Sequence, residues 1–125
     1  MRIAEASARS GLTQDTIRFY EKSGMLAPVT RDARGWRAFS TDDINWLTTL
    51  ERLRATGMPL EDVKHFATSV YAADCDAPAQ QAKRLALLQD HAKTLARKRA
   101  ELDACEAYLT HKINVYVTRL EKHDG

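Results

Sequence analysis

Cysteine is scarce in this 125-residue sequence, and its two cysteines, Cys75 and Cys105, lie far apart. Small domains that depend on disulfides carry many more cysteines, so this chain does not belong with them. We expect free thiols, inert core residues or metal ligands instead. Long apolar runs and a secretion signal are also missing, which argues against a membrane span. The sequence therefore predicts a cytoplasmic protein with no membrane partner.

The sequence also lacks the patterns that catalysis needs. It has no glycine-rich phosphate loop, and its four histidines are scattered along the chain. No serine or cysteine has a suitably spaced base. Glu61 and His65 share a helix face at a spacing that a metal can use, but an exposed helix face is the commoner explanation. We therefore do not expect an enzyme.

What is present fits one small folded domain with an extension, since 44% of the residues are apolar and 29% are charged. The net charge of +2 is unevenly distributed. Residues 1–37 hold seven Lys/Arg against four Asp/Glu, a balance of +3, whereas residues 38–76 hold three against seven, a balance of −4. The basic first segment suits an anionic partner, although many enzymes show a similar excess.

Glycines and capping residues divide the first part of the chain into short helices. Gly11 ends the first helix, and Thr13 is a good N-cap for the second, which ends before Gly24. Two helices joined by such a turn form a helix-turn-helix pattern. Asp32 and Gly35 then supply turn chemistry for a small hairpin, or wing, whose second strand is Trp36–Phe39.

Apolar spacing and caps define the remaining segments. Ser40 caps a third helix, and Pro59 starts a fourth. We expect helices at about 3–10, 13–23, 41–56 and 59–70, a wing at about 25–39, a linker at 71–78 and a long helix at 79–123. Residues 1–70 would form a winged helix-turn-helix domain.

The long helix carries a heptad repeat that predicts a coiled coil. Two of its core positions are charged, Arg99 and Glu106. An antiparallel pair centred near Leu102 places Arg99 opposite the partner's Glu106, whereas a parallel pair places like charges together. The fold class that we predict is mainly α, a winged helix-turn-helix domain followed by a long antiparallel coiled-coil dimerisation helix. The expected dimer interface consists of Leu85, Leu88, Ala92, Leu95, Arg99, Leu102, Glu106, Leu109, Ile113, Tyr116 and Leu120.

Three segments carry a family resemblance: RIAEASARSGLTQDTIRFYEKSGML at 2–26, RGWRAFSTDDINWL at 34–47 and ERLRATGMPLEDV at 51–63. Over roughly residues 2–70 the sequence resembles the MerR family of bacterial transcription regulators. The resemblance implies a homodimer that binds a pseudo-palindromic promoter and activates or represses transcription by distorting the spacer DNA in response to an effector. RNA polymerase would be an indirect partner.

The resemblance also implies which side chains reach DNA. Base readout would fall to Thr13, Gln14 and Thr16 at the start of the second helix. The DNA backbone would be contacted by Arg18, Phe19, Tyr20, Arg34 and Arg37, with Phe19 either packed or at the groove edge. An alternative is a DNA-bending architectural or recombination-accessory protein without an effector, because such proteins share the winged helix.

The sequence leaves three alternatives for the effector. Cys75 lies where metal-sensing members of the family carry a cysteine, but no cysteine follows Cys105. A metal ion held by Cys75 and the partner's His123 at the end of the coiled coil is one possibility, and a reactive Cys75 that senses oxidants or electrophiles is another. A small organic ligand near Phe66, Tyr71 and Tyr108 is a third. We expect Cys105 to be inert.

Overall fold

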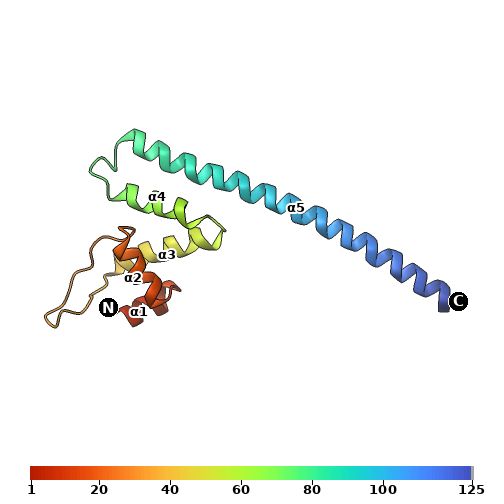
Figure 1. The fold of residues 1–125 in the computed structure, drawn as a ribbon, viewed down its shortest axis with the longest axis horizontal. Coiled ribbons are helices and arrows are strands. Elements are labelled where there is room, and N and C mark those ends of the chain that lie inside the picture. The colour runs from red at the N-terminus through yellow and green to blue at the C-terminus, as the bar shows by residue number, and fades with distance from the viewer. Residues whose placement is uncertain (125) are drawn as a thin grey trace. The chain divides into compact units, whose positions relative to one another are not determined.

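The computed structural model describes residues 1–124 and is mainly helical (Figure 1). Its helices, in chain order, are α1 (Ile3–Ser10), α2 (Gln14–Lys22), α3 (Thr41–Ala55), α4 (Leu60–Val70) and α5 (Pro78–Asp124). The mainly helical fold class predicted from the sequence is thus confirmed. Over this described range, no helix is both long and apolar enough to cross a membrane.

The chain divides into two compact units, and the boundary lies inside α5. The first unit is Met1–Gln89, and the second begins at Asp90. The first turns of α5 therefore belong with α1 to α4. The sequence placed the boundary at the linker 71–78 instead, because a heptad repeat does not show which early turns of a helix also pack on another element.

Local signals explain where the first two helices end and begin. Gly11 ends α1 with a left-handed φ of 81°, and its N–H donates to the Ser7 carbonyl. A residue with a Cβ is strained at that φ, so glycine suits this position. The Thr13 side chain accepts a hydrogen bond from the Thr16 N–H and so caps α2. These two devices fix the turn between the helices.

A capping box starts α3, since Ser40 accepts from the Asp43 N–H while the Asp43 carboxylate accepts from the Ser40 N–H. Two free amides of the first turn are thereby satisfied. Pro59 precedes α4. The Trp46 indole of α3 donates to the Met25 carbonyl at 2.8 Å and ties the start of the wing to the helical core.

The core of the first unit forms where α1, α2, α3 and α4 meet. α1 packs on α2 and α3, and α3 packs on α4. Leu87 of α5 lies against this core. Full burial of a large apolar side chain in this core stabilises the fold by about 1.5–3 kcal/mol. The buried apolar residues are Ala6, Ile17, Tyr20, Met25, Leu26, Phe39, Ile44, Leu47, Leu50, Met58, Val63 and Ala67.

Residues 25–39 form a hairpin loop rather than a regular strand pair. Within residues 1–124 the only β pairing is one antiparallel bridge between Arg31 and Arg37. The sequence-based expectation of a strand at Trp36–Phe39 was wrong, although the wing itself is present. A lone hairpin is marginally stable without neighbouring strands, so only the residues that flank its tip form a bridge here.

Candidate nucleic-acid interface

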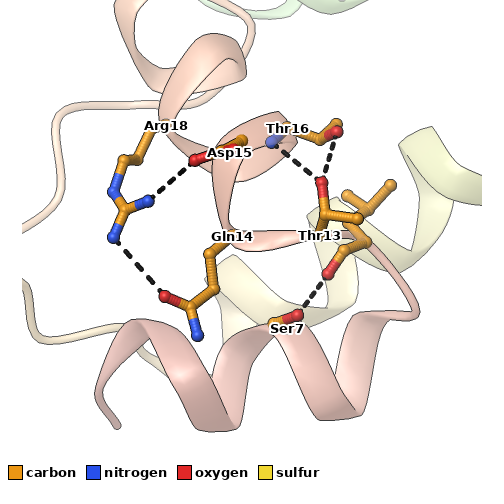
Figure 2. Close-up of polar contacts among 7 residues, drawn as sticks. Ser7, Thr13, Gln14, Asp15, Thr16 and Arg18 are labelled. Atoms are coloured by element: carbon orange, nitrogen blue, oxygen red, sulfur yellow. Dashed lines mark hydrogen bonds and ion pairs between the residues drawn. The ribbon is translucent and has the colours of Figure 1, made fainter.

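The first turn of α2 presents a small polar surface (Figure 2). The Thr13 hydroxyl accepts from the Thr16 N–H at 3.2 Å and donates to the Thr16 hydroxyl at 2.8 Å. The cap therefore occupies Thr13 and leaves the Thr16 hydroxyl hydrogen and the Gln14 amide N–H groups available to a ligand. Of the three predicted base readers, Gln14 and Thr16 keep free donors, whereas the Thr13 hydroxyl is bonded to Thr16.

Arg18 lies one turn further along α2, and its side chain contacts Gln14 and Asp15 in the first turn (Figure 2). Its guanidinium donates to the Asp15 carboxylate at 3.0 Å and to the Gln14 side-chain oxygen at 3.4 Å. The Asp15 side chain is 95% exposed. Such an exposed ion pair stabilises by about 0–1 kcal/mol, so a DNA phosphate can replace the carboxylate easily. Sequence reasoning missed Asp15, whose carboxylate can accept a hydrogen bond from a cytosine amino group.

The two adjacent aromatic residues of α2 face opposite environments. Tyr20 is only 3% exposed and lies in the core, while Phe19 is 48% exposed. Burial also raises the pKa of the Tyr20 hydroxyl above its ordinary value. The Tyr20 ring packs with Ile17 on the inner face of α2, so only its hydroxyl is left for a DNA phosphate, and that contact stays a prediction. The exposed ring of Phe19 is compatible with the predicted position at the groove edge, which stays a prediction.

The tip of the wing is organised by Asp32. Its carboxylate accepts hydrogen bonds from the N–H groups of Arg34 and Trp36, at 2.9 and 3.1 Å. Gly35 takes a left-handed φ of 77° in this turn, and its carbonyl accepts from the Arg31 guanidinium. The turn leaves the Arg34 side chain without a hydrogen bond or ion pair to any of residues 1–124, so its charge is available to a partner.

Arg37 fastens the wing to α2. Its Nε donates to Glu21 at 3.1 Å, and the two side chains are 27% and 19% exposed. The second carboxylate oxygen of Glu21 is buried and has no hydrogen-bond partner within the described chain. Arg37, predicted to contact the DNA backbone, thus also positions the wing beside the recognition helix. The terminal guanidinium N–H groups of Arg37 have no hydrogen-bond partner among residues 1–124, and the predicted phosphate contact stays a prediction.

A cavity of about 250 Å³ lies between the wing, α2 and the start of α1. Arg2 and Trp36 both line this cavity, and the Arg2 guanidinium carbon lies over the Trp36 ring, 4.3 Å from the ring centroid. We call this the arginine cavity, because five arginines line it: Arg2, Arg18, Arg31, Arg34 and Arg37. Such a concentration of guanidinium groups is typical of phosphate recognition.

Sequence reasoning named three of these five arginines and missed Arg2 and Arg31. Their contribution depends on the backbone contact between the first residues and the end of the wing, where the Phe39 N–H donates to the Met1 carbonyl at 2.6 Å. Residues so distant in the chain share no periodicity. The only available signal was the basic balance of residues 1–37.

The candidate effector residues are not brought together within one chain. Cys75 is partly buried and Cys105 is exposed. Within residues 1–124 no group of three or more His, Cys, Asp or Glu side chains is placed to hold a metal ion. The predicted site of Cys75 with the partner's His123 needs a second chain, so it stays a prediction.

All predicted interface residues of α5, from Leu85 to Leu120, are exposed in the single chain. Leu102, the centre of the predicted seam, is 69% exposed. Neither Arg99 nor Glu106 forms an ion pair within the described chain. An exposed apolar row of this length indicates a surface that another molecule covers. The antiparallel pairing of two such helices stays a prediction.

A capped recognition helix, a wing fastened beside it and a cavity lined by arginines together define a helix-turn-helix DNA-binding protein. Residues 1–69 match the family described as MerR HTH family regulatory protein, and residues 44–112 match that described as MerR, DNA binding. The chain belongs to the MerR family of transcription regulators, as the sequence resemblance implied.

Individual relatives support the same assignment. An uncharacterised HTH-type transcriptional regulator of Haemophilus influenzae is 35% identical over 113 residues, or 90% of this chain and 81% of the relative. The crystal structure of a MerR family regulator from Listeria monocytogenes matches with a TM-score of 0.80 and 28% identity, over 96% of this chain and 88% of that one. HiNmlR, a MerR family regulator lacking the sensor domain and crystallised bound to promoter DNA, matches with a TM-score of 0.68 and 35% identity, over 82% of this chain and 75% of that one. These relatives are transcriptional regulators.

Proposed function

We propose that this protein binds a pseudo-palindromic promoter in the cytoplasm as an antiparallel homodimer and regulates transcription by distorting the spacer DNA. It acts on RNA polymerase only through the shape of the promoter, and it catalyses no reaction. The arginine cavity beside the capped start of α2 carries this proposal. The promoter DNA bound to the similar regulator HiNmlR supports it.

The proposed DNA contacts are of two kinds. Gln14 and Thr16 read base edges in the major groove, where an amide can pair with adenine. The arginine cavity holds backbone phosphates, which fix register and strengthen binding without reading sequence. Since the wing is fastened to α2 through Arg37 and Glu21, both kinds of contact move as one body. Binding energy from two such bodies can then deform the spacer between them.

A footprint on promoter DNA tests this function directly. We expect protection of one pseudo-palindrome between the two promoter elements, with enhanced cleavage where the spacer is deformed. The two-fold symmetry of a dimer requires two half-sites at a fixed separation. Protection of several sites away from any promoter would instead favour an architectural DNA-bending protein.

Replacing Arg18 with alanine is expected to weaken binding to all DNA sequences alike and to lower the salt slope of the affinity by about 1, because one phosphate contact is lost.

Replacing Gln14 with alanine is expected to relax base preference at one position, by about 1–3 kcal/mol of discrimination. Fluorescence anisotropy with matched and mismatched operators at several salt concentrations measures both effects. An Arg18→Ala variant with unchanged affinity and salt slope would contradict the placement of α2.

A further inference from the structure

The first unit contains a second cavity, of about 380 Å³, outside the proposed DNA interface. We call it the α4–α5 cavity, because its walls are the second half of α4, Ala72 of the connecting segment and the first turns of α5. Its volume falls in the range of small-molecule sites, about 300–1,000 Å³. None of the residues that we assign to DNA lines it, and none of the predicted coiled-coil seam residues does.

Two neighbouring cations in this cavity have no counter-ion. Arg84 is partly buried and donates only to neutral groups, the Ser69 carbonyl and hydroxyl at 3.2 and 3.3 Å and the Cys75 carbonyl at 2.6 Å. Lys83 beside it is exposed and forms no hydrogen bond or ion pair with any of residues 1–124. For Arg84, a charge without a counter-ion in a partly desolvated site raises the free energy of the empty state. An anion bound here relieves that cost.

Two acidic residues near the cavity, Asp74 and Glu61, already have side-chain partners. Gln80 donates to the Asp74 carboxylate at 3.2 Å, and His65 pairs with Glu61 at 3.6 Å. Both carboxylates therefore have partners other than Lys83 and Arg84. The lining as a whole stays positive, since none of its members is an Asp or Glu.

The rest of the lining is apolar and well supported. Phe66 is stacked on Trp46 with ring centroids 6.2 Å apart, and Leu87 packs against the core. Ala72 leaves room beside them. A small inorganic anion makes no use of such a surface, whereas an organic acid can place its hydrocarbon body there and its charge beside the cations.

We propose that the α4–α5 cavity binds a small organic acid, with its carboxylate between Lys83 and Arg84 and its aromatic or branched aliphatic body against Phe66 and Leu87. The proposal builds on the regulatory function above, because the acid then acts as the effector. Bound there, it adds a link between α4 and the first turns of α5. The site differs from the organic-ligand site expected from the sequence: Tyr71 packs edge-on against Trp46, and neither Tyr71 nor Tyr108 lines the cavity.

Two-dimensional NMR of the full-length ¹⁵N-labelled protein tests the proposal without DNA. Benzoate, salicylate and 1-naphthoate are titrated beside their neutral amides. We expect saturable shifts centred on Phe66, Ser69 and Leu87 for the acids, and at least tenfold weaker binding of each amide. Lys83→Glu should weaken the acids tenfold or more, whereas Lys93→Glu, the same charge change on α5 outside the cavity, should leave their affinity unchanged.

Ala72→Met provides a variant that fills the cavity without changing its charge, and it should also abolish the shifts. Equal binding of acids and amides, or acid binding that survives both Lys83→Glu and Ala72→Met, would overturn the proposal. Absence of shifts with all three acids would overturn it as well. Promoter affinity measured on the same samples separates the two claims. Wild-type protein that binds the acids but no promoter contradicts the proposed function alone, and the converse contradicts the cavity alone.

Discussion

Truncating Tyr20 to alanine is expected to lower the free energy of unfolding by about 3–5 kcal/mol, because a large buried ring leaves a cavity in the core. Truncating its neighbour Phe19 should change stability by less than about 1 kcal/mol, since that ring is half exposed. Urea unfolding followed by circular dichroism, at one protein concentration for all variants, measures both values. A larger loss for Phe19→Ala than for Tyr20→Ala would reverse the orientation of α2.

Tyr20→Phe separates packing from DNA contact. This variant keeps the ring and removes only the hydroxyl, so we expect near-normal stability and unchanged promoter affinity. Phe19→Ala, in contrast, should weaken promoter binding while the protein stays folded. If Tyr20→Phe lost affinity in proportion to a missing phosphate contact, the expectation that the Tyr20 hydroxyl contacts DNA would be confirmed.

Reversing the charge of Arg99 is expected to weaken the homodimer roughly thirtyfold. In the proposed antiparallel seam Arg99 faces the partner's Glu106 twice by symmetry, so Arg99→Glu replaces two attractions with two repulsions. At roughly 1 kcal/mol for each contact, the total is about 2 kcal/mol. Sedimentation equilibrium over a concentration series measures the change in dimer affinity.

Rescue by Glu106→Arg in the same chain identifies the register. The double variant restores opposite charges across an antiparallel seam and should recover most of the lost affinity. Arg97→Glu is the matched control, because Arg97 lies on the opposite side of α5 from the heptad seam, and it should leave the dimer unchanged. A double variant as weak as Arg99→Glu would exclude this antiparallel register.

Helix ends were the most predictable part of the fold, because they depend on neighbouring residues. Gly11 and the capping box of Ser40 and Asp43 act within a few positions, so a sequence displays them directly. The recognition helix was predictable for the same reason. The wing was less so, since a single bridge between Arg31 and Arg37 has no strand pattern of its own.

The interface was only partly predictable. Helical spacing placed Ile17 and Tyr20 on one face, which the structure buries, but the family resemblance assigned Tyr20 to DNA. The arginine cavity joins Arg2 to the wing through tertiary contacts that no local pattern records. The heptad repeat likewise marked only the predicted dimer face of α5. It gave no sign that Arg84 and Leu87, on another face, line the α4–α5 cavity.

The hydrogen bonds of Arg84 stiffen the segment that connects α4 to α5. One guanidinium holds Ser69 at the end of α4 and Cys75 in the connection, while its own backbone is part of α5. A connecting segment whose backbone carbonyls are free can absorb a rotation of one helix relative to the next. A segment whose carbonyls at both ends accept hydrogen bonds from one rigid guanidinium resists that rotation. We therefore expect a rotation of the first turns of α5 to move α4 as well instead of being absorbed in residues 71–77.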